Sequence, residues 1–373
     1  MGKWQSQMEN LEVMQQLFGN VYAGKTILIT GHTGFKGSWL TLWLHQLGAI
    51  VSGYSLDEVT TPSHFKLLNI DVETQYGDIR DKQKLEAFFS DVQPEVVFHL
   101  AAQSLVRESY RNVALTYETN ITGTLNVFEA ARKCNSVKAI INVTTDKVYE
   151  NLEQQQAYQE QDRLGGHDPY SSSKACSEIL TSSYRNSFLK DGSILLASAR
   201  SGNVIGGGDW ANERLIPDIM RSVSNNKVVE IRSPESVRPW EHVLEPLSGY
   251  LLLGKKLLQR KNEFAEAWNF GPKPEQVLQV RQILEKMQQQ WNKINFKINE
   301  ENAKQFHEAK SLQLNCTKAY KQLKWKPVWS MDKTIEHTIN WYKNYFENKA
   351  LNSLSDLKEY AEDAKKMSLS WTL

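Results

Sequence analysis

The stretch from Thr26 to Trp39 constrains the fold of this chain more than any other part of the sequence. Its first five residues are an apolar run rich in β-branched side chains, which predicts a buried strand. Glycines then recur every third residue, at Gly31, Gly34 and Gly37, and a helix-compatible apolar segment follows. A strand, a glycine turn and a helix open a βαβ unit that lays a pyrophosphate against a helix N-terminus. Taken alone, the same pattern also fits a tight turn between a strand and a helix.

Strands and helices alternate over the following residues. Buried strands are predicted at 96–102, 139–145 and 194–200, with helices at 112–133 and 169–188 between them. This alternation predicts an α/β fold with a parallel doubly wound sheet, a Rossmann fold. We expect an N-terminal extension at 1–24 that docks as a short helix and a dinucleotide-binding domain at 25–204. A smaller mixed substrate-binding cap is expected at 205–373, with segments near 235–250 and 266–272 returning to the sheet.

Composition excludes several classes of function. The chain has 44 basic and 43 acidic residues, so no global field attracts nucleic acid or an anionic membrane. Mean hydropathy is −0.51, and no apolar run approaches the length of a membrane span. The cysteines at 134, 176 and 316 lack metal-ligand spacing, which predicts reduced thiols and no metal site. The N-terminus lacks the apolar core of a signal peptide, so we expect a cytoplasmic protein.

The cofactor candidates follow the strand ends. Asp57 comes about twenty residues after the last glycine, where an acidic group meets the adenosine ribose, although a turn aspartate fits equally. Lys36 faces either a cofactor phosphate or solvent. Small residues after the strand at 96–102 let a dinucleotide lie close to the backbone. The predicted cofactor-binding set is Gly31, Thr33, Gly34, Phe35, Lys36, Gly37, Asp57, Asp78, Ile79, Leu100, Ala101, Ala102, Tyr170 and Lys174.

The strongest catalytic signal is Tyr170 with Lys174 at the start of a predicted helix. A spacing of four places both side chains on one helix face. An ammonium group there lowers the pKa of the phenol, so that a tyrosinate becomes available as a base. Such pairs are common on solvated helices. Here, however, the pair follows a dinucleotide turn and a strand ending in Thr145, Asp146 and Lys147, which is the apparatus of a short-chain dehydrogenase.

At this point the chain resembles the extended short-chain dehydrogenase/reductases, and among them the CDP-glucose 4,6-dehydratases. The resemblance spans residues 25–345. Its narrowest motifs are Gly-His-Thr-Gly-Phe-Lys-Gly at 31–37, the Asp-Lys pair at 146–147 and Arg-Pro-Trp-Glu-His at 238–242. Further matches are His-Leu-Ala-Ala-Gln at 99–103, the block at 165–176, the glycine-rich block at 202–210 and His-Glu-Ala at 307–309. One departure is Ser201, where the resemblance leads us to expect alanine.

The resemblance implies an internal redox cycle with NAD as the cofactor. Tyr170 takes the proton of the sugar 4-hydroxyl while NAD⁺ accepts the C4 hydride, and Thr145 bonds the 4-oxygen. Asp146 protonates the leaving C6 hydroxyl, and the hydride returns to C6. Where dTDP-glucose relatives are expected to carry a glutamate base, this chain has Lys147. It acts either as the C5 base, with a depressed pKa, or only as a positioning group.

The resemblance further implies that a nucleotide sugar is held by Gln103, Arg107, Asn203, Arg214, Arg238 and His307. The predicted function is therefore a hydro-lyase acting on CDP-D-glucose, on a path to deoxysugars of a bacterial surface polysaccharide such as the lipopolysaccharide O-antigen. The alternatives are a nucleotide-sugar 4-epimerase and a non-catalytic dinucleotide-sensing protein. We expect a homodimer or homotetramer built through a four-helix bundle of 112–133 and 170–188.

Overall fold

A computed structural model describes residues 14–373, apart from 59, 152–155, 232, 274–275 and 299–311. Its centre is a seven-stranded sheet in the order β11-β6-β5-β4-β1-β2-β3, with each neighbouring pair parallel. The strands are β1 Thr26–Thr30, β2 Ile50–Ser55, β3 Glu73–Tyr76, β4 Val96–His99, β5 Ala139–Val143, β6 Leu195–Ser201 and β11 Ala267–Phe270. The predicted doubly wound sheet is confirmed, and β11 is the late strand expected to return to it.

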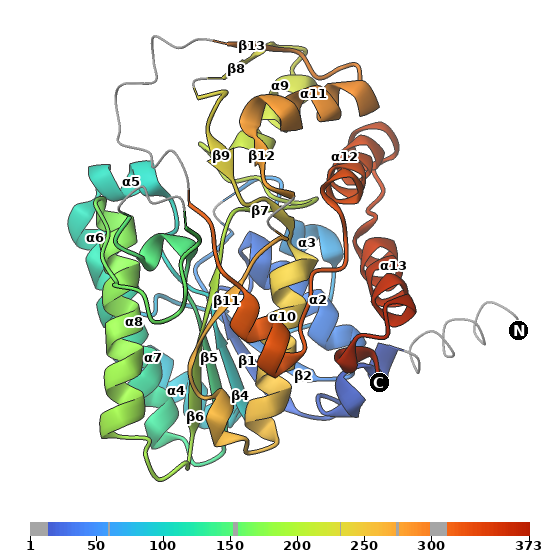
Figure 1. The fold of residues 1–373 in the computed structure, drawn as a ribbon. Coiled ribbons are helices and arrows are strands. Elements are labelled where there is room, and N and C mark those ends of the chain that lie inside the picture. The colour runs from blue at the N-terminus through green and yellow to red at the C-terminus, as the bar shows by residue number, and fades with distance from the viewer. Residues whose placement is uncertain (1–13, 59, 152–155, 232, 274–275, 299–311) are drawn as a thin grey trace, which may run out of the picture.

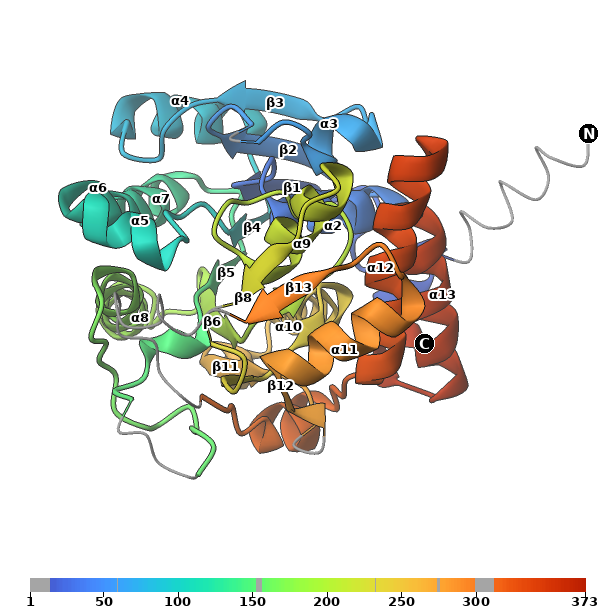
Figure 2. The ribbon, with the colours of Figure 1, turned by 90° about the horizontal axis from the view of Figure 1, so that it is seen from above.

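Helices cover both faces of the sheet (Figures 1 and 2). One face carries α4 Lys82–Val92, α5 Val106–Arg111, α6 Val113–Tyr117, α7 Thr124–Lys133 and α8 Pro169–Ser187. The other face carries α2 Phe35–Gln46 and α10 Leu244–Leu258, and α10 is buried along most of its length. In the described part of the chain, no helix is both long and apolar enough to cross a lipid bilayer.

The cap lies over the carboxyl ends of the strands (Figure 1). It contains α9 Leu215–Ser224, α11 Val280–Gln290 and the parallel pair β8 Val229–Ile231 with β13 Phe296–Ile298. Two short ribbons connect it to the sheet, β7 Val204–Ile205 with β10 Glu241–His242, and β9 Val237–Arg238 with β12 Leu278–Gln279. The cap is thus held at the edge of the sheet where parallel α/β folds bind ligands.

The C-terminal helices are α12 Met331–Asn348 and α13 Ser353–Lys366. They belong to the segment 205–373, which is expected to be mainly cap apart from the stretches near 235–250 and 266–272. Tyr360 of α13 packs edge-on against Trp43 of α2, with ring centroids 5.7 Å apart. Trp371 stacks on Phe18 at 5.2 Å, which joins the two ends of the described chain on the outer side of α2. Aromatic packing therefore returns the last segment to the sheet.

The stretch 60–71 after β2 contains the short helix α3 His64–Leu68. One predicted helix differs in form from the expectation. The helix expected over 112–133 begins with α6, widens into a π-helical turn at Glu118–Gly123 and continues as α7. The side-chain amide of Asn120 in that turn donates hydrogen bonds to the Gln103 carbonyl and the Ser173 hydroxyl, which fasten it to the neighbouring elements.

Candidate active site

The glycine turn joins β1 to α2 in a shape that only glycine permits. Gly31 has φ +78°, and a Cβ there would lie 2.7 Å from the backbone nitrogen of Ala101. A Cβ on Gly37 would lie 2.1 Å from the carbonyl oxygen of Gly31. No described side chain caps the start of α2, and its first turn has no acidic residue. The free N–H groups and the helix dipole at this point fit the phosphates of a dinucleotide.

The remaining cofactor candidates lie along the same edge of the sheet. Thr33 bonds the hydroxyl of Ser55 at 2.7 Å, so the turn is tied to the end of β2. Asp57 is exposed just beyond that strand. Asp78 pairs with Arg80, whose Nη2 donates a hydrogen bond to Asp78 Oδ2 at 2.7 Å. Ile79 is buried. Leu100, Ala101 and Ala102 follow β4 and are half-buried, facing the glycine turn.

The structure brings four of the five catalytic candidates together: Thr145, Asp146, Tyr170 and Lys174. Asp168 caps α8 by accepting a hydrogen bond from the Ser171 N–H at 2.9 Å, and so fixes where Tyr170 and Lys174 begin the helix. Lys174 Nζ donates to the carbonyl of Val143 at 3.1 Å, which ties α8 to the end of β5. Thr145 Oγ1 donates to Asp146 Oδ1 at 3.0 Å and also hydrogen-bonds Tyr170.

Burial, rather than Lys174, dominates the acidity of the phenol. It raises the pKa of Tyr170 to about 12, although the hydrogen bond from Thr145 and the charge of Arg214 lower it. Burial, followed by the charge of Lys36, lowers the pKa of Lys174 to about 8. We expected a nearby ammonium to lower the pKa of the phenol, but in the protein without ligands the pKa is raised. The free-energy cost of removing a phenolate from water is larger than the stabilisation that the nearby positive charges provide.

Lys147 lies at the open side of this cluster. Its Nζ is 3.7 Å from Asp146 Oδ1, and 31 % of its side chain is exposed. By contrast, Asp146 is 1 % exposed, and its Oδ2 has no hydrogen-bond partner among the described residues. The pair therefore has one buried member, Asp146, and one partly exposed member, Lys147.

The Lys36 side chain points toward strand β6 and helix α10. Its Nζ donates to the Ser201 hydroxyl at 2.6 Å, and Ser201 in turn bonds the Tyr250 hydroxyl at 2.9 Å. Burial lowers the pKa of Lys36 to about 8, although the charge of Glu241 opposes this. Ser201, the one departure from the expected motif, thus holds a buried ammonium that alanine would leave with one fewer partner.

Sequence reasoning missed Glu241. It is 2 % exposed, and neither carboxyl oxygen has a hydrogen-bond partner among the described residues. Burial, together with the charge of Glu245, raises its pKa well above the usual range. The sequence could have indicated that this carboxylate is buried. Glu241 lies between the aromatic residues Trp240 and His242, in a segment that was predicted to return to the sheet.

The substrate candidates occupy different settings. Gln103 donates hydrogen bonds from its side-chain amide to the Leu105 carbonyl and to the hydroxyl of Thr116 in α6. Arg214 reaches from the cap to Ser104 at 3.1 Å and Asp209 at 3.2 Å, and its charge acts on Tyr170 and Lys36. Arg107 lies on α5, Asn203 before β7 and Arg238 in β9. His307 lies outside the described residues.

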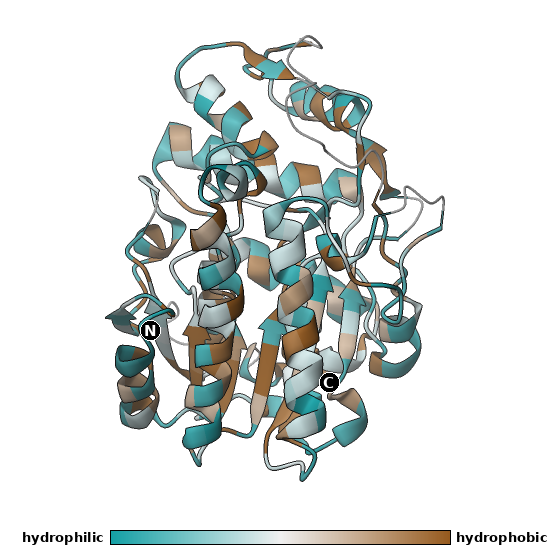
Figure 3. Cartoon of the chain, turned by 90° about the vertical axis from the view of Figure 1, so that its left-hand side faces the viewer, coloured by the Kyte–Doolittle hydropathy of each residue, from teal (hydrophilic) through white to brown (hydrophobic). Residues whose placement is uncertain are grey.

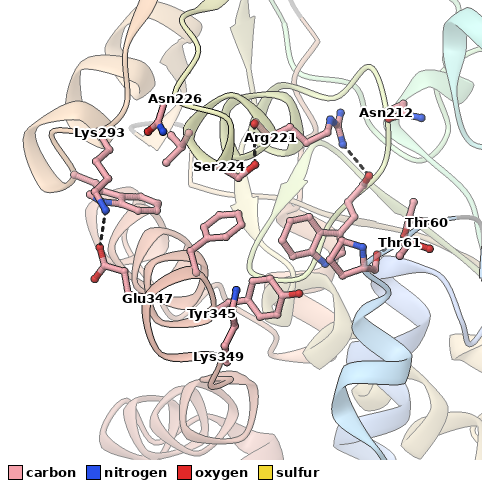
Figure 4. A pocket seen from close by; sticks show the side chains of 15 residues that line it. Thr60, Thr61, Asn212, Arg221, Ser224, Asn226, Lys293, Tyr345, Glu347 and Lys349 are labelled. Atoms are coloured by element: carbon pink, nitrogen blue, oxygen red, sulfur yellow. Dashed lines mark hydrogen bonds and ion pairs between the residues drawn. The ribbon is translucent and has the colours of Figure 1, made fainter.

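A surface hollow of about 710 Å³ lies apart from this cluster, between α9, α12 and the loop at Thr60 and Thr61 (Figure 4). None of the catalytic candidates lines it. Of its three basic groups, Arg221 pairs with Asp218 and Lys293 pairs with Glu347 at 3.2 Å, while Lys349 lies over the Tyr345 ring. Because the hollow contains none of the catalytic candidates, we do not place the substrate there.

Comparison with known proteins is consistent with this geometry. The family model described as GDP-mannose 4,6 dehydratase matches residues 28–338. The chain is 45% identical over 351 residues to CDP-glucose 4,6-dehydratase of Salmonella typhimurium, covering 91% of this chain and 97% of that protein.

Solved structures show the same fold at lower identity. An epimerase from Methanothermobacter thermautotrophicus superposes with a TM-score of 0.78 at 23% identity, covering 90% of this chain and 96% of the other. A dTDP-glucose 4,6-dehydratase from Streptomyces venezuelae, solved with NAD and TYD bound, gives 0.70 at 22% identity, covering 85% and 97%.

Proposed function

The chain belongs to the GDP-mannose 4,6-dehydratase family, and from that premise we propose that it is an NAD-dependent nucleotide-sugar 4,6-dehydratase acting on CDP-D-glucose. The reaction gives CDP-4-dehydro-6-deoxy-D-glucose and water. The substrate assignment rests on the 45% identity to a CDP-glucose 4,6-dehydratase over nearly the whole of both chains. The reaction type is supported by the joint presence of an oxidation pair, Tyr170 and Lys174, and a dehydration pair, Asp146 and Lys147.

The residues along the sheet edge fit NAD. The glycine turn and the uncapped start of α2 would hold the pyrophosphate, Asp57 the adenosine ribose, and Lys174 the nicotinamide ribose. When bound, NAD⁺ supplies a hydride acceptor that later returns the hydride, and its positive ring favours ionised Tyr170. The side chains of this chain position the sugar and move protons around that exchange.

Oxidation at C4 requires a base at the 4-hydroxyl. Tyr170 Oη accepts that proton, and Thr145 Oγ1 holds the 4-oxygen in place. Because Tyr170 is 8 % exposed, water does not compete for the phenolate. The resulting ketone acidifies the proton on C5.

Dehydration requires an acid and a base on neighbouring carbons. Asp146 gives a proton to the C6 hydroxyl as the C6–O bond breaks, and Lys147 Nζ removes the C5 proton. The two groups are adjacent in sequence and 3.7 Å apart, close enough to act on adjacent carbons of one sugar ring. An epimerase has no need for this pair, which is why we favour a dehydratase.

Arg238, Arg214 and Asn203 are the groups that we assign to the diphosphate, since planar guanidinium groups suit bidentate phosphate contacts. All three lie on segments that join the sheet to the cap. Arg107, Gln103 and His307 are the further candidates for the nucleotide and sugar, although Gln103 would first have to release its loop bonds.

We also propose a homodimer or homotetramer formed through α6, α7 and α8. Val113 of α6, Ile179 of α8 and Phe188 at the end of α8 are 44%, 57% and 51% exposed. Figure 3 views the side of the molecule on which these helices lie, with the ribbon coloured by hydropathy. Packing against a second copy would cover them in a four-helix bundle. The enzyme would act in the cytoplasm, on a path to deoxysugars of a bacterial surface polysaccharide such as the O-antigen.

The test is to incubate the purified protein and NAD⁺ separately with CDP-, UDP-, dTDP- and GDP-glucose. We expect the alkali-induced absorbance of a 4-keto-6-deoxy sugar with CDP-glucose first, and none with a Tyr170→Phe variant. A galactose-configured product would instead establish the epimerase, and absence of any turnover would support a dinucleotide-sensing protein.

A further inference from the structure

Helix α8 and the end of β5 each carry part of the catalytic cluster. Tyr170 and Lys174 lie in the first two turns of α8, whereas Thr145 and Asp146 come directly after β5. In the proposed reaction the pair on α8 serves oxidation at C4, and Asp146 with Lys147 serves dehydration. The placement of the end of β5 against α8 therefore decides whether one bound sugar can reach both pairs.

Buried hydrogen bonds join the two elements before the strand ends. The side-chain amide of Asn142 in β5 donates to the hydroxyl groups of Ser177 at 3.1 Å and Thr181 at 2.8 Å. At the next residue of the strand, the Val143 carbonyl accepts a hydrogen bond from Lys174 Nζ at 3.1 Å. Two successive residues of β5 are thus fastened to α8.

Thr144 extends this series to the residue that precedes Thr145. Its hydroxyl donates a hydrogen bond to Glu178 Oε1 of α8, and its backbone N–H donates to the Ala199 carbonyl of β6 at 2.9 Å. The side chains of Thr144 and Glu178 are both buried, and a hydrogen bond away from water is electrostatically stronger than one in solvent. Thr144 therefore links α8 to the start of the catalytic segment.

Glu178 is a firmly held partner for this bond. Its Oε2 accepts hydrogen bonds from the Ser198 hydroxyl at 2.7 Å and from Arg200 Nη2 at 2.7 Å, both on β6. Arg200 Nη1 in turn donates to the Tyr149 hydroxyl at 2.8 Å. Because charge-assisted bonds hold one carboxylate oxygen in place, the other oxygen presents Thr144 with an acceptor at a fixed position.

We propose that Thr144 is a positioning residue for dehydration. Through Glu178 it fixes the end of β5 against α8, so that Asp146 reaches the C6 hydroxyl of a sugar whose 4-hydroxyl lies at Tyr170. This inference rests on the proposed function, which gives Thr144 and Glu178 no task of their own. Neither residue touches the substrate, and both act through the segment that follows β5.

Lys174 is a second tie at this point, but it also has a task in catalysis. In the proposed function its ammonium group holds the nicotinamide ribose, so its contact with the Val143 carbonyl is shared with the cofactor. The bond between Thr144 and Glu178 involves no ligand. The end of β5 is therefore held against α8 by a contact that does not depend on the cofactor.

Loss of this contact should impair dehydration more than oxidation. Oxidation depends mainly on Tyr170 and Lys174 of α8 and on NAD⁺ at the glycine turn, none of which follows β5. Dehydration depends on Asp146 and Lys147, which both follow it. Misplacing a reacting group by about 1 Å can slow a step by about a hundredfold, so we expect Thr144→Val to slow dehydration by about tenfold to a hundredfold.

The experiment compares Thr144→Val, Thr144→Ser and the wild-type enzyme with NAD⁺ and CDP-glucose in single turnovers. The absorbance of reduced nicotinamide follows oxidation, and the keto-deoxy product follows dehydration. Thr144→Val should accumulate reduced nicotinamide, because oxidation then outruns dehydration. Thr144→Ser keeps the hydroxyl and should behave like the wild type. The affinity for NAD⁺, measured by isothermal titration calorimetry, should be the same in all three proteins.

Ser198→Ala is the matched control for the loss of a buried hydroxyl. It also removes a donor to Glu178, but it leaves the Thr144 bond and the ion pair with Arg200 in place. Thermal unfolding should show losses of stability of similar size in Ser198→Ala and Thr144→Val. Only Thr144→Val should accumulate reduced nicotinamide.

A Thr144→Val variant that loses stability without accumulating reduced nicotinamide would overturn the proposal. Accumulation of the same size in Ser198→Ala would overturn it too, because a general loosening of the core would then explain the effect. So would a serine variant that behaves like the valine variant, since the hydroxyl would not be the group that matters. Failure of the proposed function looks different, because the wild-type enzyme itself would then form no keto-deoxy product.

Discussion

Gly37→Ala tests the glycine turn most sharply, because the structure specifies the collision. The new Cβ would lie 2.1 Å from the Gly31 carbonyl oxygen and 2.8 Å from the His32 Cα. Ordinary contact begins near 3.4 Å, so the overlap with the carbonyl exceeds 1 Å, and both obstacles are backbone atoms that no rotamer change can move. The start of α2 must therefore shift away from β1.

Relieving an overlap of this kind costs about 1–3 kcal/mol. Trp39 and Trp43 anchor α2 in the core with no exposure, so we expect the helix to remain folded while its first turn is displaced. If that cost falls on the phosphate cradle (the glycine turn and the first turn of α2), the affinity for NAD⁺ should decrease by about tenfold to a hundredfold. Isothermal titration calorimetry measures the affinity, and thermal unfolding measures the fold.

Gly34→Ala is the matched control for the fold. Its Cβ would meet only the Gly31 carbonyl oxygen, at 3.3 Å, so a movement of a few tenths of an ångström suffices. Its melting temperature should stay closer to that of the wild type than that of Gly37→Ala. Wild-type NAD⁺ affinity in Gly37→Ala would refute the reasoning, since the collision would then have been absorbed without disturbing the cradle.

Three further predictions address the site and its support. Lys147→Ala should still reduce bound NAD⁺ when substrate is added but should lose dehydration; near wild-type product formation would show that another group is the C5 base. Glu178 forms a 2.7 Å ion pair with Arg200, and the two side chains are 1% and 4% exposed. Because Glu178→Ala leaves the buried guanidinium of Arg200 without this carboxylate, it should lower the free energy of unfolding by about 3–5 kcal/mol in chemical denaturation. A loss below about 1 kcal/mol would contradict this. His337 lies 2.9 Å from Asp356; burial lowers its pKa, but the bond and charge of Asp356 outweigh burial and raise it. A group whose pKa is raised in the folded state stabilises that state at pH values below its unfolded-state pKa, and this stabilisation is lost as the pH rises through the folded-state pKa. The free energy of unfolding should therefore fall over that pH range, and it should fall less in His337→Gln.

Much of the fold was predictable because each element carries its own local signal. The strands predicted at 96–102, 139–145 and 194–200 are found as β4, β5 and β6, and the helix predicted at 169–188 is found as α8. The return of 266–272 to the sheet was predicted from a short apolar strand and is confirmed as β11. The helix α13 and its packing on α2 were not predicted, because they depend on contacts between the two ends of the chain.

The site shows the same division between local and long-range information. The spacing of Tyr170 and Lys174 follows from one helix, and Thr145 follows from the end of one strand. The direction of Lys36 depends instead on Ser201 and Tyr250, which approach from strand β6 and helix α10. The pKa of Tyr170 likewise depends on how deeply the cap and sheet bury the phenol, and no pattern within the sequence reports that.

The most direct test of the central claim is to follow the hydrogen on C4. CDP-D-glucose carrying deuterium at C4 should be converted, with NAD⁺ and the purified protein, into a 4-keto-6-deoxy product with that deuterium on C6, as read by mass spectrometry and NMR. A product with no deuterium on C6, or one that retains it on C4 of an epimerised sugar, would contradict the account.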